Sequence, residues 1–367
     1  MVEGIDAVWA FLTAALVTLL LVRPAEALAR RVGAIDEPGP RSQHSFPTPR
    51  MSGLAILAGI QVAGWIWLPI NTETLSILLG ALVVALVGAL DDMFDLPPGV
   101  KLLGQLGAAT IPVVGGVYPA NLTVPFFGGF ELGWVAYPLT VVGIALVMNI
   151  INLIDGIDGL AAGFCAIACA AMAIIAVSLE RYEAGALAAL TAGSAIGFLR
   201  YGFPPASSFM GDTGSNLLGY MIAVASVQGA LKTNAVIALV FPLVILAVPL
   251  FDTAFVVLKR LKYRQPIFQA DRSHFHHRMA NIGFSQRRTL LYLYGWTLVL
   301  ALLALALRFV PYSDDRGNFD PIWTAIMAAV LLSALAVTVY LAFVLEIIKR
   351  PRWRDEDRAD GPPPETG

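Results

Sequence analysis

The sequence is poor in charged residues and lacks any long polar stretch. Asp, Glu, Lys and Arg together make up 14% of its 367 residues, whereas soluble globular domains carry about 25%. Hydrophobic residues account for 57% of the chain. This balance excludes an ordinary soluble enzyme and is typical of a protein that crosses the membrane several times.

Cysteine is also scarce, with only Cys165 and Cys169 in the whole chain. They lie four residues apart in an alanine-rich apolar run, which matches neither a disulfide framework nor a zinc-binding pattern. We interpret both as small packing residues. Because no polar stretch is long enough for a second folded unit, we expect one transmembrane catalytic domain over residues 1–348. Residues 349–367 are rich in charge, proline and glycine and predict a disordered cytoplasmic tail.

Long apolar runs fill most of the remaining chain. A helix needs about 20 apolar residues to cross the hydrocarbon core of a bilayer, so the predicted fold class is an all-α polytopic membrane protein with about eleven transmembrane helices. The predicted spans lie near residues 5–22, 52–70, 75–90, 102–118, 133–151, 160–178, 186–203, 214–230, 234–251, 289–308 and 321–345.

Lysine and arginine are distributed very unevenly between the two sides of these spans. If the N-terminus is outside, twenty of the 24 fall in inner segments, and the other four are Arg181, Lys232, Arg308 and Arg316. Cytoplasmic loops of membrane proteins carry such an excess of positive charge. We therefore expect the N-terminus outside, the C-terminus in the cytoplasm and every polar motif described below on the cytoplasmic face.

Three carboxylates lie at the membrane edge, directly after the span that ends near residue 90. Asp91 and Asp92 are adjacent, and Asp95 is one helical turn beyond Asp91 if the helix continues. Carboxylates this close repel one another unless a cation neutralises them, and oxygen-rich sites suit Mg²⁺, with Mn²⁺ as the alternative metal. A solvated helix end is the interpretation that requires no function.

A second polar motif, Asn149 to Gly159, ends one span and precedes the next. Asn149 and Asn152 share a helix face, and the two Asp-Gly steps at Asp155 and Asp158 permit a tight turn close to a ligand. Asp158 could instead cap the following helix. Capping leaves both asparagines and Asp155 unexplained at membrane depth, where polar groups are costly and often functional.

A third motif places Gly211 and Gly214 around Asp212, just before another apolar helix. Glycines at a helix start can leave backbone N–H groups free to hold a phosphate. Capping explains Asp212 or Ser215 singly, but it does not explain both glycines. We therefore expect a phosphate-binding segment here.

Three of the four histidines, His274, His276 and His277, fall within four residues of the longest cytoplasmic loop. Their spacing matches no standard structural zinc site, so we expect these imidazoles to contact phosphate or sugar; a surface loop without a role is the alternative. A proline-stiffened loop near the start adds Arg41, His44 and Arg50, which could meet an anionic substrate. An ordinary positively charged cytoplasmic loop explains its arginines almost as well.

Taken in order, these motifs resemble those of the polyprenyl-phosphate N-acetylhexosamine-1-phosphate transferases, in the branch of WecA and TagO, which is related to MraY. The resemblance spans about residues 33–285, and the His-x-His-His form is similar to the branch that uses UDP-N-acetylhexosamines. One departure is Ser52, where the family often has a glycine before Gly53. The motifs that carry the resemblance are Pro38 to Gly53, Asp91 to Asp95 with Lys101 to Gln105, Asn149 to Gly159, Gly211 to Ser215, and His274 to His277.

The resemblance implies an enzyme that transfers N-acetylhexosamine 1-phosphate, with N-acetylglucosamine 1-phosphate the expected group, from a UDP-sugar to polyprenyl phosphate with release of UMP. The product would be the lipid-linked first sugar of a cell-envelope glycan, such as cell wall polymer or lipopolysaccharide, made at the bacterial plasma membrane. The expected partners are UDP-N-acetylhexosamine, polyprenyl phosphate and the lipid bilayer. A homodimer is compatible with the sequence, and no nucleic acid partner is expected.

The resemblance also implies roles for single residues. Asp212 is the first candidate for a Mg²⁺ ligand and Asp92 the second, while Asp91 and Asp92 would place or deprotonate the lipid phosphate, with the division between them open. Asp158 is the candidate partner of the uracil. The full catalytic set is Asp91, Asp92, Asp95, Lys101, His274, His276 and His277, and the substrate-binding set is Arg41, His44, Asn149, Asn152, Asp155, Asp158, Gly211 and Ser215.

Two other functions are compatible with acidic motifs in a membrane protein. A prenyltransferase of the UbiA kind also holds a diphosphate through magnesium and aspartates, but its paired Asp-rich motifs leave no place for the segments around Asp212 and His274. A transporter should carry its ionisable residues near the membrane midplane, whereas here they gather at one face.

Overall fold

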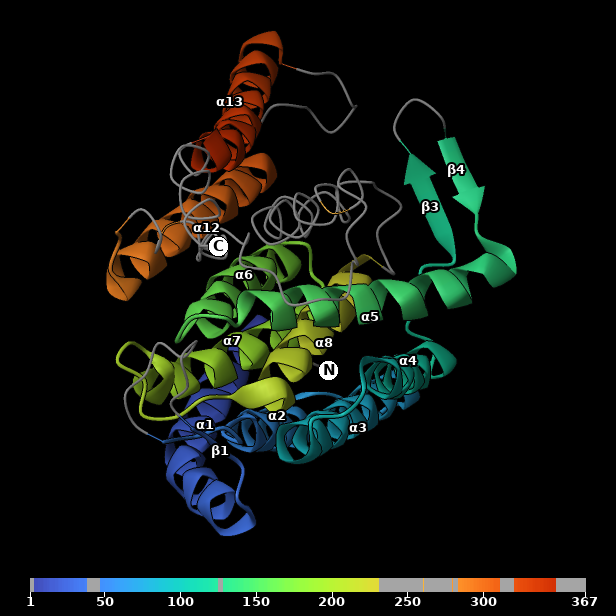
Figure 1. The fold of residues 1–367 in the computed structure, drawn as a ribbon. Coiled ribbons are helices and arrows are strands. Elements are labelled where there is room, and N and C mark those ends of the chain that lie inside the picture. The colour runs from blue at the N-terminus through green and yellow to red at the C-terminus, as the bar shows by residue number, and fades with distance from the viewer. Residues whose placement is uncertain are drawn as a thin grey trace, which may run out of the picture. The chain divides into compact units, whose positions relative to one another are not determined.

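The computed structural model describes residues 3–37, 47–124, 128–230, 260, 279, 283–310 and 320–347. The chain divides into two compact units, one of residues 1–247 with 292–309 and the other of residues 248–291 with 310–367. Figure 1 shows the larger unit as a set of helices packed side by side. Every contact discussed below lies within this unit.

The described part of the chain is mostly helical, as the sequence predicts. Each predicted span except 234–251, which lies outside the described residues, overlaps a helix. The helices are α1 (Gly4–Val32), α2 (Gly53–Trp67), α3 (Thr72–Phe94), α4 (Pro98–Val114), α5 (Ala136–Ile154), α6 (Leu160–Ser178), α7 (Tyr182–Gly202), α8 (Gly211–Ala230), α12 (Gln286–Phe309), α13 (Pro321–Ile347) and the 3₁₀ helix η1 (Gly133–Val135).

Six of the described helical segments are long and apolar enough to cross a membrane: α1, α3, α5 with η1, α6, α7 and α12. Helix α2 is apolar but shorter, with 15 residues. These helices confirm a polytopic membrane protein, while the number of eleven spans and the orientation stay predictions.

Two short antiparallel β-ribbons were not expected from the sequence. Strand β1 (Ile35–Asp36) pairs with β2 (Thr48–Pro49), and β3 (Asn121–Val124) pairs with β4 (Gly128–Glu131). Strands of two to four residues carry too little alternation to stand out from a loop. The first ribbon brings the segment before α2 close to the end of α1.

Helix α1 also extends further than the predicted span, through Pro24 to Val32. Its last turns are amphipathic, with Ala25 and Ala29 buried and Arg30 and Arg31 exposed. This pattern continues a helix after the apolar run has ended.

Helices α1 and α7 approach each other closely because of two glycines one turn apart. A side chain carbon on Gly193 would lie 2.2 Å from the Phe11 carbonyl oxygen, and one on Gly197 would lie 2.4 Å from that of Ala15. Small residues at a four-residue spacing let helix backbones pack tightly in membranes, where van der Waals contact rather than the hydrophobic effect drives association.

Candidate active site

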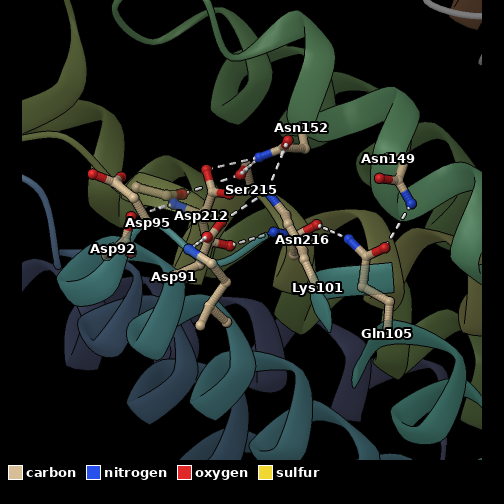
Figure 2. A network of polar contacts seen from close by, with 12 residues as sticks. Asp91, Asp92, Asp95, Lys101, Gln105, Asn149, Asn152, Asp212, Ser215 and Asn216 are labelled. Carbon is tan, nitrogen blue, oxygen red and sulfur yellow. Dashed lines mark hydrogen bonds and ion pairs between the residues drawn. The ribbon is translucent and has the colours of Figure 1, made fainter. Parts of the chain in front are cut away.

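Three polar side chains, each from a different helix, converge on the ammonium group of Lys101, near the start of α4 (Figure 2). The Lys101 Nζ atom lies 3.0 Å from Asp91 Oδ2 at the end of α3, and it also contacts Asp212 Oδ2 at the start of α8. It donates a longer hydrogen bond of 3.4 Å to Asn152 Oδ1, in the last turn of α5. One cation therefore neutralises two carboxylates that would otherwise repel each other.

Asn152 is held so that its amide oxygen faces this lysine. Its Nδ2 atom donates to Asp212 Oδ1 at 3.0 Å and to Ser215 Oγ at 2.9 Å. Ser215 Oγ in turn donates to the Gly211 carbonyl at 3.1 Å. Asn152, Asp212 and Ser215, three residues that the sequence predicted for the site, thus form one connected group.

Asp92 has a different environment from its neighbour Asp91. Its carboxylate is almost fully buried, with 1% of the side chain exposed. It accepts hydrogen bonds from the backbone N–H of Asp212 at 2.8 Å, the backbone N–H of Thr213 at 3.0 Å and Thr213 Oγ1 at 2.6 Å. Asp92 therefore caps the N-terminus of α8, where a negative charge is stabilised by the helix dipole.

This contact corrects one expectation from the sequence. The backbone N–H groups after Gly211 were expected to be free to hold a phosphate, but those of Asp212 and Thr213 bind Asp92. Gly211, which has φ of +65°, permits this approach, because a side chain carbon there would lie 2.5 Å from Asp92 Oδ2 and 2.2 Å from the Arg50 carbonyl oxygen. The glycine is needed for helix-to-helix packing at the site.

Asp95 lies at the rim of the site rather than at its centre. Helix α3 ends at Phe94, and Asp95 follows in a left-handed conformation with φ of 47°. Its side chain is exposed and lies 3.3 Å from Arg50 Nη2, while Arg50 Nε is 3.5 Å from Asp92 Oδ1. Although burial of Arg50 opposes its charge, the carboxylates of Asp92 and Asp95 raise its pKa.

The side-chain amides of Gln105, Asn149 and Asn216 form a hydrogen-bonded chain next to the acidic group. Of these three, only Asn149 was predicted as a site residue. Asn149 Nδ2 donates to Gln105 Oε1 at 2.7 Å and to the Ala145 carbonyl at 2.8 Å, so both its N–H groups bind protein. Gln105 Nε2 donates to Asn216 Oδ1 at 2.8 Å, and Asn216 Nδ2 donates to the Asp212 carbonyl at 2.8 Å. Asn149 therefore supports the site indirectly, through Gln105 and Asn216. Polar residues within apolar helices are costly and often functional, and this is the sequence signal that could have identified Gln105 and Asn216.

The turn between α5 and α6 carries the other two predicted aspartates. Asp158 Oδ2 accepts a hydrogen bond of 3.1 Å from the Ala206 N–H, so Asp158 ties the turn to the segment before α8. The residue that caps α6 is Gly159, with φ of 75°, and no side chain bonds the helix start. Capping by Asp158, the alternative considered from the sequence, is therefore wrong. Asp155 keeps some exposed surface, yet burial by the surrounding protein raises its pKa well above the usual value, and the charges of Asp212, Asp92 and Asp158 raise it further.

The segment before α2 packs against the segment before α8, and Ser52 fits this contact. The Gly53 N–H donates to the Met210 carbonyl at 3.0 Å, and Ser52 Oγ lies 2.5 Å from Ser208 Oγ in a buried position. The serine therefore preserves the close packing that a glycine pair would allow. Five predicted site residues, Arg41, His44, His274, His276 and His277, lie outside the described residues.

The donor atoms at the site are oxygens from Asp91, Asp212, Asn152 and Ser215, which is the chemistry that Mg²⁺ or Mn²⁺ prefers. Within the described ranges no group of three or more His, Cys, Asp or Glu side chains converges on one point. Mg²⁺ commonly binds through one or two carboxylates and completes its shell with water and substrate phosphates. The two carboxylates that Lys101 now bridges fit this type of site.

A family model described as glycosyl transferase family 4 matches residues 74–230, the part of the chain that holds every residue labelled in Figure 2. The chain is also 41% identical over 302 residues to the probable undecaprenyl-phosphate N-acetylglucosaminyl 1-phosphate transferase of Bacillus subtilis. This match covers 82% of this chain and 84% of that protein. The chain belongs to glycosyl transferase family 4.

Other relatives match over similar lengths. The decaprenyl-phosphate N-acetylglucosaminephosphotransferase of Mycobacterium leprae is 33% identical over 370 residues, covering 92% of this chain and 90% of that protein. The phospho-N-acetylmuramoyl-pentapeptide-transferase of Moorella thermoacetica is 32% identical over 323 residues, covering 83% and 99%. These matches confirm the family resemblance inferred from the motifs.

Proposed function

We propose that this protein transfers N-acetylglucosamine 1-phosphate from UDP-N-acetylglucosamine to a polyprenyl phosphate. The observation that carries the proposal is the convergence of Asp91, Lys101, Asn152 and Asp212 at one point, in a chain whose relatives are named for this type of transfer. An oxygen of the lipid phosphate forms a bond to the phosphorus that carries the sugar. The bond from that phosphorus to the bridging oxygen breaks, and UMP leaves with the electron pair.

Both substrates are anions, so alignment and neutralisation of charge matter more for this reaction than a strong base. The lipid phosphate is already largely ionised at neutral pH. We assign Asp91 to the lipid phosphate side, because its Oδ2 faces Lys101. We assign Asp92 to the orientation of α8, because its carboxylate accepts hydrogen bonds from the backbone N–H groups at the start of that helix. The sequence left this division of roles open, and we propose it on these contacts.

We propose Mg²⁺ as the cofactor, with Asp212 as the main ligand, Asp91 beside it and Mn²⁺ as a substitute. When bound, the metal would neutralise the diphosphate and withdraw charge from the phosphorus under attack. Lys101 then has a second use. Its ammonium, which bridges Asp91 and Asp212 in the structure, is placed to contact phosphate oxygens once a metal takes over the carboxylates.

The turn from Asp155 to Gly159 is the proposed nucleotide side of the site. Asp158 is anchored at Ala206 through one oxygen, and its other oxygen can accept a hydrogen bond from the uracil N–H. The expected contacts of Arg41, His44 and the histidines at 274, 276 and 277 with the anionic substrates stay predictions.

The membrane arrangement completes the proposal. Eleven spans with the N-terminus outside would place the site at the cytoplasmic face of the bacterial plasma membrane, where UDP-sugars are available. The twenty-to-four distribution of basic residues supports this orientation. The polar group lies at helix ends rather than at mid-helix, which argues against a transporter, and the relatives' names give no support to a prenyltransferase.

The test uses the purified full-length protein in detergent with polyprenyl phosphate, Mg²⁺ and a panel of UDP-sugars, and it measures UMP release. We expect UMP with UDP-N-acetylglucosamine and little with UDP-glucose. Polyprenol without its phosphate is the matched control and should give none. Release of UMP at the same rate with polyprenol would contradict transfer to the lipid phosphate.

A further inference from the structure

Tyr294 on α12 contacts the Asp155–Gly159 turn from outside the polar group described above. Its hydroxyl donates a hydrogen bond of 2.6 Å to the Gly159 carbonyl. Gly159 is the N-cap residue of α6 and adopts a left-handed conformation. A tyrosine hydroxyl in a partly buried position is therefore used to hold one peptide group of the turn.

The packing of the ring shows that the contact is specific. A side chain carbon on Gly163 would lie 2.0 Å from both the Cζ and the hydroxyl oxygen of Tyr294. Only glycine at this position lets the ring lie on the α6 backbone and reach the carbonyl one turn earlier. The hydrogen bond of Tyr294 therefore requires a residue without a side chain at position 163.

The turn is held from two sides. Asp158 binds the Ala206 N–H on one side, and Tyr294 binds the Gly159 carbonyl on the other. The two anchors lie on adjacent residues. Ala206 holds the Asp158 carboxylate itself, and Tyr294 holds the peptide group between Gly159 and Leu160, which fixes the backbone just after Asp158. The position of the Asp158 carboxylate depends on this backbone as well as on its own hydrogen bond.

We propose that Tyr294 is a positioning residue for the nucleotide, acting through the Gly159 carbonyl on the orientation of Asp158. This role rests on the proposed function, in which the turn binds the uridine part of the donor. It assigns to α12 a part in donor binding without any contact between Tyr294 and substrate. The lipid phosphate and the metal are not affected by this contact.

The chain offers a matched control in Tyr220 on α8. Its hydroxyl donates to the Ile77 carbonyl at 3.0 Å, and a side chain carbon on Gly80 would lie 2.1 Å from that hydroxyl. The arrangement of tyrosine, carbonyl and glycine is the same, but Ile77 lies 14 residues before Asp91 on α3, or about 21 Å along the helix. Tyr220→Phe therefore removes the same kind of hydrogen bond from a tyrosine whose partner is Ile77 and not the turn.

The experiment compares Tyr294→Phe, Tyr220→Phe and wild type by equilibrium binding of UMP and by steady-state kinetics. Tyr294→Phe should raise the Kd for UMP and the KM for the UDP-sugar about 5-fold, the effect expected for loss of one neutral hydrogen bond. The KM for polyprenyl phosphate and the Mg²⁺ midpoint should not change. Tyr220→Phe should leave UMP binding unchanged even if it lowers thermal stability.

Hydrogen exchange of the wild type gives a second measurement that does not depend on a variant. Bound UMP should slow exchange of the amides in residues 155–163, and absence of this protection would overturn the proposal. Unchanged UMP binding by folded Tyr294→Phe, or equal weakening in both variants, would overturn the role of Tyr294 alone. A wild-type protein that neither binds nor releases UMP would overturn the proposed function and this role with it.

Discussion

The Asp92 carboxylate accepts a hydrogen bond of 2.8 Å from the backbone N–H of Asp212, while the adjacent Asp91 faces Lys101 at 3.0 Å. Neighbouring residues on a helix point about 100° apart, so two consecutive aspartates serve different partners. Asp92 joins α3 to α8, and Asp91 faces the point where the polar side chains meet. This arrangement predicts different failures when each is changed.

Asp91→Asn should lower turnover at least about 100-fold, or 2.7 kcal/mol, and leave the fold intact. Its remaining oxygen can still accept the Leu96 N–H, which now binds Oδ1 at 2.8 Å. Asp92→Asn should lower both turnover and stability, because an amide nitrogen would replace one acceptor for Asp212 or Thr213. Loss of a buried charge-assisted hydrogen bond costs about 2–3 kcal/mol. Thermal unfolding in detergent checks the difference, and equal stability of the two variants would contradict it.

Asp212→Asn should raise the Mg²⁺ concentration needed for half-maximal turnover at least about 10-fold, since one anionic ligand is lost. Asp158→Asn is the matched variant at the nucleotide side. It should weaken UMP binding and leave the Mg²⁺ midpoint unchanged. Mn²⁺ binding followed by electron paramagnetic resonance gives a readout apart from activity. An unchanged metal midpoint in folded, active Asp212→Asn would exclude Asp212 as the main ligand.

Gly197→Ala should destabilise the protein by about 2 kcal/mol, because the added carbon would overlap the Ala15 carbonyl on α1. Gly143→Ala on α5 is the control, since no atom lies within 4 Å of its added carbon. The control should be neutral or stabilising. Unfolding temperatures of the two variants test this, and the account of α1–α7 packing fails if Gly197→Ala is as stable as Gly143→Ala.

Cysteines placed at Glu37 and Asn121 should react with membrane-impermeant reagents from opposite sides of the membrane. Both positions are exposed in the structure, and both native cysteines are buried, so the parent chain is the unlabelled control. The charge distribution predicts Glu37→Cys to react from the cytoplasm and Asn121→Cys from outside. Reversed labelling would place the polar group on the wrong side for cytoplasmic UDP-sugars.

Much of the fold could be predicted from the sequence because membrane spans are long and apolar. The predicted span 160–178 coincides with α6, while α1 continues beyond the predicted span 5–22 to Val32, because Pro24 does not end the helix and the turns after it are amphipathic. The two β-ribbons could not be predicted, since strands of two to four residues carry too little alternation to stand out from a loop.

The site shows the same limit in its details. The motifs, together with the family resemblance, were enough to select Asp91, Lys101, Asn152 and Asp212, which the structure brings together. It could not tell Asp91 from Asp92, because their different roles arise from the packing of α8 against α3. Likewise, the contact of Tyr294 with Gly159 joins residues 135 positions apart, and no local pattern in the sequence points to it.

The most direct test of the central claim follows the sugar and the phosphorus of the donor separately. The substrate is UDP-N-acetylglucosamine carrying one label in the sugar and another in the phosphorus attached to it, incubated with the protein, polyprenyl phosphate and Mg²⁺. The account predicts that both labels enter the lipid in equal amounts, with one unlabelled UMP released for each. Transfer of the sugar label alone, with UDP as the released product, would contradict it.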